Sequence, residues 1–218
     1  MSEELAKLIK IITTGTAVEV KNAQKRIERI WNQSCRDMEK RRMFSVFLEA
    51  ARDFDKIPDV EHQAYFINTL KWAFYFALPE TFPIWTELLI GWVQHPDGKI
   101  RIAAVRAAQY LSDTMESDSE DRPDRPHQYS PETKQFAKDC FCIFALRADQ
   151  LITKYHKPAF NKYRYISSLP AGIYKSAQQL LHESILTCPR FERMYDEFLD
   201  KMNRKAAPDS HQQLLGHA

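Results

Sequence analysis

The stretch of residues 91–111 constrains the fold of this chain more than any other part of the sequence. In its middle, residues 95–98 (His-Pro-Asp-Gly) place proline and glycine close together, which predicts a turn between two helices. After the turn, small apolar residues recur at the spacing of one helix face, at Ile100, Ala103, Ala104, Ala107 and Leu111. This stripe predicts a helix that packs closely on a neighbouring helix.

A second feature is a repeated spacing of apolar residues in the first half of the chain. Val20, Val60 and Ile100 are forty residues apart, and the same step separates Ile27, Ile67 and Ala107. A period near forty is typical of the helix pairs of HEAT and armadillo repeats. The alternative is a chance spacing within an ordinary helical bundle.

The residues around the central turn resemble the second half of a HEAT repeat, in which Pro-Asp precedes a Val/Ile-Arg pair and an alanine-rich face. Pro-Asp occurs at residues 58–59 and 96–97, and Ile100-Arg101 completes the pattern. The pair is weaker at Val20-Lys21 and reversed in charge at Val60-Glu61. The resemblance implies an all-α fold, a short right-handed α-α superhelix of about four HEAT-like antiparallel helix pairs.

The rest of the chain predicts more helices and no strand, because no segment alternates convincingly with period two. We expect residues 1–206 to form a single HEAT-like helical repeat domain. Residues 112–131 are rich in Asp, Glu, Ser and Pro and lack apolar periodicity, which predicts a mobile loop. Residues 207–218 are polar and predict a frayed tail.

Net charge and glycine usage exclude several classes of function. A formal charge of +2 creates no strong field that would attract nucleic acid or a membrane. The five glycines occur singly, so the chain has no glycine-rich loop of the P-loop or dinucleotide-binding type. No apolar run approaches the roughly 20 residues that cross a bilayer. We therefore predict no bound cofactor and no membrane partner.

The four cysteines, Cys35, Cys140, Cys142 and Cys188, predict free thiols. Cys140 and Cys142 are two residues apart in an expected helix, so they point away from each other and do not form an ordinary disulfide. The acidic N-terminus does not resemble a secretory signal. We predict a cytoplasmic protein whose cysteines are core or boundary residues rather than a nucleophile or a zinc site.

Catalytic motifs are missing from the sequence. The chain contains no G-x-S-x-G, no H-E-x-x-H and no paired C-x-x-C. We therefore assign no catalytic residue and no metal ligand, and we favour a role other than catalysis. A catalytic site assembled across helices stays an alternative, because one sequence does not reveal it.

Trp85 and Trp92 lie seven residues apart and hence on one face of an expected helix. In one interpretation both indoles pack in the core between helices. In the other, an indole such as that of Trp92 is exposed in a concave groove and contacts a ligand.

The strongest local candidate for a binding site is the stretch of residues 154–165, in which cationic and aromatic side chains are interleaved without any acid. This mixture suits phosphate contacts with stacking on unpaired bases, or an acidic peptide. The candidate binding residues of this stretch are Lys154, Tyr155, Lys157, Lys162, Tyr163 and Arg164. The alternative is structural: Lys and His oppose the negative end of a helix dipole, and the tyrosines pack the loop.

Arg101 and Arg106, on the alanine-rich helix, complete the candidate binding residues. Arg101 is also placed to form an ion pair with Asp97, four residues earlier.

These features predict a non-catalytic interaction scaffold that binds a protein or peptide on the concave face of a HEAT-like array. The alternative is a nucleic-acid-binding protein similar to the HEAT-like DNA alkylation-repair glycosylases. That resemblance implies aromatic and acidic groove residues on a damaged nucleotide and basic side chains on phosphates. Superficially suitable residues, with no residue-by-residue match, are Trp92, Asp97, Arg101 and Arg106. A third interpretation is an enzyme or carrier with a pocket between buried aromatic helices.

Overall fold

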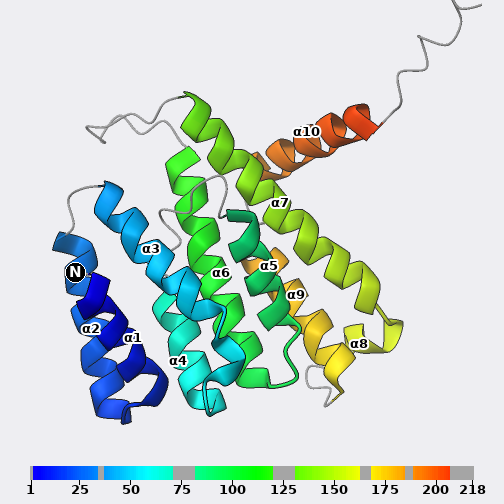
Figure 1. The fold of residues 1–218 in the computed structure, drawn as a ribbon. Coiled ribbons are helices and arrows are strands. Elements are labelled where there is room, and N and C mark those ends of the chain that lie inside the picture. Colours follow the sequence, from blue (N-terminus) through cyan, green and yellow to red (C-terminus); the bar gives the residue numbers. More distant parts are fainter. Residues whose placement is uncertain are drawn as a thin grey trace, which may run out of the picture.

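The computed structural model of the chain is all-helical over the residues that it describes (Figure 1). These are residues 2–33, 37–70, 82–119, 131–162, 168–184 and 189–206. No strand occurs among them, which confirms the all-α prediction. None of the helices in these ranges is long and apolar enough to cross a membrane.

The described helices are numbered in chain order. They are α1 (Ser2–Thr14), α2 (Ala17–Gln33), α3 (Asp37–Ala51), the 3-10 helix η1 (Phe54–Lys56), α4 (Val60–Leu70), α5 (Phe82–Val93), α6 (Gly98–Ser119), α7 (Pro131–Tyr155), α8 (Pro158–Lys162), α9 (Leu169–Ser184) and α10 (Pro189–Ala206).

The helices pack as pairs, and the pairs lie against one another (Figure 1). α1 packs on α2, α5 on α6, and α7 on α9. α4 packs on α6 and α6 on α9, so that α4, α6 and α9 form a continuous row. α6 is the centre of the molecule, because it contacts α5 and α7 as well as both of its neighbours in the row.

Side-chain hydrogen bonds cap the N-terminal ends of α2, α4 and α6 and so determine where these helices begin. Before α2, the N–H of Thr16 donates to Glu19 Oε2 at 2.8 Å, and the N–H of Glu19 returns a bond to Thr16 Oγ1 at 3.4 Å, which is a capping box. Asp59 caps α4 by accepting the N–H of His62 at 2.9 Å. Asp97 caps α6 in the same way through a backbone N–H of the first turn, at 2.7 Å.

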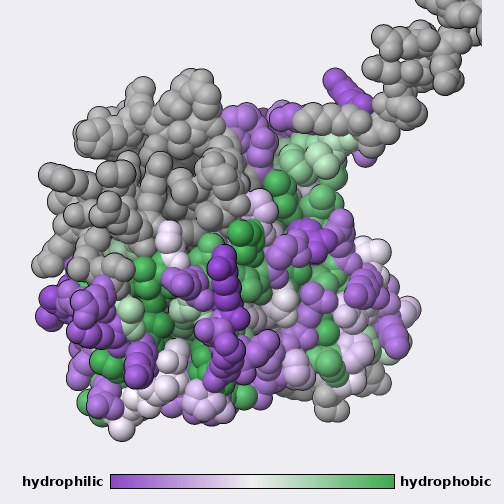
Figure 2. Space-filling model, in the orientation of Figure 1, coloured by the Kyte–Doolittle hydropathy of each residue, from purple (hydrophilic) through white to green (hydrophobic). Residues whose placement is uncertain are grey.

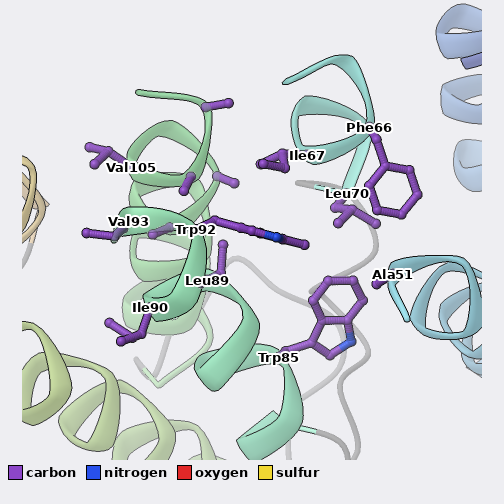
Figure 3. Close-up of a cluster of buried hydrophobic side chains, with 14 of the residues drawn as sticks. Ala51, Phe66, Ile67, Leu70, Trp85, Leu89, Ile90, Trp92, Val93 and Val105 are labelled. Carbon is purple, nitrogen blue, oxygen red and sulfur yellow. The ribbon is translucent and has the colours of Figure 1, made fainter. Parts of the chain in front are cut away.

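The core between α3, α4, α5 and α6 is filled by aromatic side chains on one side and small side chains on the other. Figure 3 shows the indoles of Trp85 and Trp92 extending from α5 toward α3 and α4. Both are buried, and the ring of Trp92 lies 4.8 Å from that of Phe54. On α6, Ala103 and Ala104 are buried, as the stripe of small residues predicts. Small side chains allow α6 to contact four helices at once.

Some boundaries differ from the sequence prediction. α6 continues to Ser119, whereas the predicted loop begins at residue 112. Residues 112–119 contain neither proline nor glycine, so the helix continues beyond the end of its apolar stripe. η1 and α8 have no counterpart in the prediction. The rest of the predicted loop, residues 120–130, and the predicted tail, residues 207–218, lie outside the described residues.

Candidate binding surface

Metal-binding and nucleophilic groups do not mark a site in the described part of the chain. No group of three or more His, Cys, Asp or Glu side chains there is arranged to hold a metal ion. Cys142 is buried, and its S–H donates to the carbonyl oxygen of Met194 at 3.6 Å. Burial raises the pKa of this thiol to about 12, so it stays protonated and unreactive near neutral pH. Cys142 is therefore a core residue, while Cys35 and Cys188 lie outside the described residues.

Trp92, a candidate ligand contact, lies inside the core. Its side chain is 5% exposed, and Figure 3 shows the indole directed toward Ile67 and Leu70 of α4. Trp85 is fully buried on the same side of α5. Core packing therefore accounts for both indoles, and neither is available to stack on a ligand at the surface.

The guanidinium group of Arg101 is held by the backbone of the turn before α6. Its Nη1 donates to the carbonyl oxygens of His95 and Pro96, at 2.7 and 2.8 Å. The group also lies against Gly172 of α9, where an added Cβ would come within 2.6 Å of Nη2. Partial burial lowers the pKa of Arg101 and the charge of Asp97 opposes this, but an arginine stays protonated in either case. Arg101 therefore joins α6 to α9, and Asp97 serves as the cap of α6.

The solvent side of α6 is a narrow strip that contains Lys99, Ile102 and Arg106. These residues follow one another at i, i+3 and i+7, and all three are exposed. Lys99 forms an ion pair with Glu61 of α4. The guanidinium group of Arg106 has no hydrogen-bond or ion-pair partner among the described residues. Of the two candidates on this helix, Arg106 is thus the one that is exposed and has no partner among the described residues.

A second strip of cations runs along α2. Lys21, Lys25 and Arg29 lie at i, i+4 and i+8, and all are exposed. None of the three has an ion-pair or hydrogen-bond partner in the part of the chain that the structure describes. Arg26, on the side of the helix that faces α1, is bound by Glu4 of α1 at 2.8 Å.

Polar contacts place the strips of α2 and α6 on either side of α4. Gln24 of α2 donates to the hydroxyl of Thr69 of α4 at 3.0 Å. Glu61, two turns before Thr69 and exposed to solvent on α4, is the residue that binds Lys99 of α6. Lys21 lies one turn before Gln24. The exposed cations of α2 and α6 therefore share one face of the molecule, with α4 between them.

α9 extends this face on the other side of α6. Lys175 lies one turn after Gly172, which contacts Arg101, and its Nζ is 5.7 Å from the centre of the Tyr174 ring. We call the solvent side of α2, α4, α6 and α9 the basic face. Its cations are Lys21, Lys25, Arg29, Lys99, Arg106 and Lys175, and its acids are Glu28 and Glu61.

The stretch of residues 154–165 begins in the last turn of α7 and continues through α8. Lys154 Nζ lies 5.2 Å from the centre of the Tyr155 ring, and Lys157 Nζ lies 5.9 Å from that of Phe160. The two lysines are exposed, while Tyr155 is half-buried and Phe160 is buried. The aromatic rings thus pack the junction of α7, α8 and α9.

A hydrogen-bonded network reinforces this junction. The hydroxyl of Tyr174 donates to Asn161 Oδ1 at 2.6 Å and accepts from Gln178 Nε2 at 2.9 Å. The side chain of Lys162 and the whole of Tyr163 and Arg164 lie outside what the structure describes. Binding by this stretch stays a prediction.

The sequence analysis does not select the basic strip of α2 as a site. The pattern that marks this strip in the sequence is the i, i+4, i+8 spacing of three cations opposite an apolar side of the helix. The cations are Lys21, Lys25 and Arg29, and the apolar side contains Val20 and Ile27. The spacing predicts a solvated side of a helix but not what lies beside it. The alignment with α6 depends on contacts between residues about forty positions apart, which one sequence does not reveal.

Comparisons with known proteins add no relative to this description. No family model, no curated protein and no solved structure matches the chain. Proposals about its function therefore depend on its own residues and contacts.

Proposed function

We propose that this chain is a non-catalytic interaction scaffold whose basic face binds an acidic segment of a protein partner. The observation that carries the proposal is a set of exposed cations on that face without a partner among the described residues, namely Lys21, Lys25, Arg29 and Arg106. Like charges on one face repel one another, and a negatively charged partner removes this repulsion. Arg26 and Arg147, by comparison, are neutralised by Glu4 and Glu87.

The composition of the basic face favours a peptide over a nucleic acid. Ile102 is 52% exposed and lies between Lys99 and Arg106 on α6, where it suits an apolar side chain better than a phosphate. The buried indoles of Trp85 and Trp92 do not offer a platform on which bases would stack. A net charge of +2 is also low for a nucleic-acid-binding domain.

We further propose a HEAT-like arrangement of the helix pairs. Val20, Val60 and Ile100 fall in the first turns of α2, α4 and α6, three of the helices of the basic face. Two turns later, Ile27, Ile67 and Ala107 are all buried. This equivalence supports a right-handed superhelix of about four pairs, in which each pair adds one helix to the binding face. An experimental structure with the helices gathered about one axis would remove this part of the proposal.

The proposed function is tested by fluorescence anisotropy with a labelled glutamate-rich peptide that contains a leucine. We expect binding at low ionic strength and weaker binding at physiological salt. The triple variant Lys21→Glu, Lys25→Glu, Arg106→Glu is expected to bind roughly tenfold more weakly, because three exposed ion pairs contribute roughly 0.2–1 kcal/mol each and about 1.4 kcal/mol corresponds to a factor of ten. The matched control is Arg52→Glu, Arg193→Glu, Arg204→Glu, at exposed cations outside the basic face, which makes the same change in net charge.

The control variant is expected to bind within about twofold of the unmodified protein, because its charges are screened from the basic face. Equal losses in the two triple variants would mean unspecific attraction and would overturn the proposal. Lack of binding at low salt would do the same. A single-stranded DNA probe is run in parallel, and preference for DNA with a steep salt dependence would favour the nucleic-acid alternative.

A further inference from the structure

His62 joins the first turn of α4 to the turn between α1 and α2. Its Nδ1 lies 2.6 Å from Asp59 Oδ2, and its Nε2 lies 2.7 Å from the carbonyl oxygen of Gly15. The ring of Tyr65 stands edge-on to the imidazole, with 6.0 Å between the ring centres. The side chain of His62 is 19% exposed. The imidazole is therefore largely enclosed, with both nitrogens directed at oxygen atoms.

Both of these oxygen atoms are hydrogen-bond acceptors. A carboxylate and a backbone carbonyl have no proton to donate. A neutral imidazole has a single N–H, so it satisfies one of them and turns a lone pair toward the other. The imidazolium form donates to Asp59 and to Gly15 at the same time. The contact thus requires a protonated His62.

Asp59 stays anionic in this arrangement. The pKa of its carboxyl group is lowered, chiefly because the backbone N–H of His62 donates to it and further because the imidazole does. The pKa of His62 is raised, first by the hydrogen bond to the Gly15 carbonyl and then by Asp59, while partial burial acts in the opposite direction. Both shifts favour the charged forms, so the two groups form a pair of opposite charges below the raised pKa of His62.

The other charges near His62 come from three elements. On α4, Glu61 adds a negative charge that raises the pKa of His62. Lys99 of α6 forms an ion pair with Glu61 and so partly offsets it. From the side of α2, Glu19 is engaged by the hydroxyl of Thr16 at 2.7 Å. The phenol ring of Tyr65, which stands edge-on to the imidazole, completes its surroundings.

We propose that His62 is a proton-dependent latch that holds the α1–α2 pair against α4. In the closed form, His62 is bonded to both Asp59 and Gly15. Because the pKa of His62 is higher in this form than in the open chain, the stabilisation by the latch is complete below about pH 6.5. The stabilisation is lost as the pH rises through the pKa of the closed form. Asp59 has the opposite sign, since its lowered pKa means that its contribution is lost only as the pH falls into the acid range.

The remaining contacts between the α1–α2 pair and α4 do not titrate near neutral pH. Gln24 and Thr69 form a hydrogen bond between uncharged groups, and α1, which packs on α4, buries apolar side chains such as Leu5. A change of protonation at His62 therefore alters this attachment without altering the others. The latch is independent of the proposed binding function, because it concerns contacts within the chain.

The experiment is an NMR titration of the full chain combined with hydrogen exchange. The imidazole signal of His62, assigned by its loss in His62→Gln, is expected to titrate above the free-histidine value. Protection of α1 and α2 amides, corrected for intrinsic rates, is expected to fall by up to about tenfold per pH unit between the pKa values of the open and closed forms. Amides of α6 serve as the internal reference, and His156→Gln, a change at an exposed histidine elsewhere, is the control variant.

In His62→Gln, protection of α1 and α2 is expected to become independent of pH, while His156→Gln keeps the dependence of the unmodified chain. Asp59→Asn is a second variant, which keeps the bond to Gly15 and is expected to lower the titration midpoint of His62. A midpoint at or below the free-histidine value would overturn the proposal. So would an unchanged pH dependence in His62→Gln.

Discussion

The α5–α6 pair and α10 represent two ways in which a helix is held in this protein. α6 contacts α4, α5, α7 and α9 and buries small side chains on most of its surface, while α5 supplies the indoles that fill the space beside it. α10 lies chiefly on α7 and extends away from the body of the molecule (Figure 1). The first region is enclosed by several helices and the second by one.

The difference is visible in the side chains that each region leaves at the surface. On α10, Phe198 is buried against the core, but Met202, one turn later, is 46% exposed. Figure 2 shows hydrophobic side chains reaching the surface where α10 crosses α7. Besides Phe198, α10 is attached by the Cys142–Met194 contact and by an ion pair between Lys201 and Asp139 at 3.8 Å. α10 therefore has few contacts to lose, and we expect it to open without unfolding the centre.

The largest effect is expected from Trp85→Ala in α5. Trp85 is fully buried, and its removal leaves a cavity that the surrounding helices fill only in part. We expect a loss of about 3–5 kcal/mol in the free energy of unfolding, measured by urea denaturation. The matched control is Ile84→Ala, at the adjacent position and 46% exposed, for which we expect a change below about 0.5 kcal/mol. Similar losses in both variants would mean that α5 is not enclosed as described.

A smaller and local effect is expected from Phe198→Ala in α10. One helix covers most of this side chain, so we expect a loss of about 1–3 kcal/mol, below that of an enclosed aromatic residue. Hydrogen exchange is expected to show faster exchange of the α10 amides and unchanged exchange in α6. Equal acceleration in both helices would show that α10 and the centre unfold together, and the comparison would fail.

The α5–α6 region at the centre of the molecule is also the part of the fold that sequence periodicity predicts best. The stripe at helical spacing falls on buried residues, such as Ile100, Ala103 and Ala107 in α6, because burial of one helix face follows directly from local spacing. The ends of helices are predicted less well. α6 continues past its stripe to Ser119, since nothing in residues 112–119 stops a helix once it has formed. The capping box of Thr16 and Glu19 is a recognisable start signal that the analysis of stripes does not use.

The candidate site depends on contacts that local spacing does not determine. Arg101 was expected to pair with Asp97 at i, i+4, but the carbonyl groups of the turn at His95 and Pro96 lie closer to its guanidinium. The sequence shows that His62 follows the helix cap Asp59 by three residues. Its second acceptor, the carbonyl oxygen of Gly15, is 47 residues earlier in the chain. Such partners meet only through packing of whole helices, so they need the structure.

The smallest effect, and the sharpest test of how closely α6 approaches its neighbours, concerns Gly172 and Arg101. An added Cβ at Gly172 would lie 2.6 Å from Nη2 and 3.0 Å from Cζ of Arg101. The guanidinium group must then move, which weakens its bonds to the carbonyls of His95 and Pro96. Opposing this loss, alanine favours a helix over glycine by about 1 kcal/mol, and Gly172 has no positive φ that would forbid it.

The two contributions are separated by a double-mutant cycle. In the Arg101→Ala background the obstacle is gone, so Gly172→Ala is expected to raise the free energy of unfolding by about 0.5–1 kcal/mol. In the unmodified chain the same substitution is expected to be neutral or destabilising, which gives a coupling of at least about 0.5 kcal/mol between the two positions. Gly172→Ala that stabilises both backgrounds equally would show that the guanidinium group of Arg101 does not rest on α9. The packing of α6 against α9 would then be looser than its packing against α5, the helix that carries Trp85.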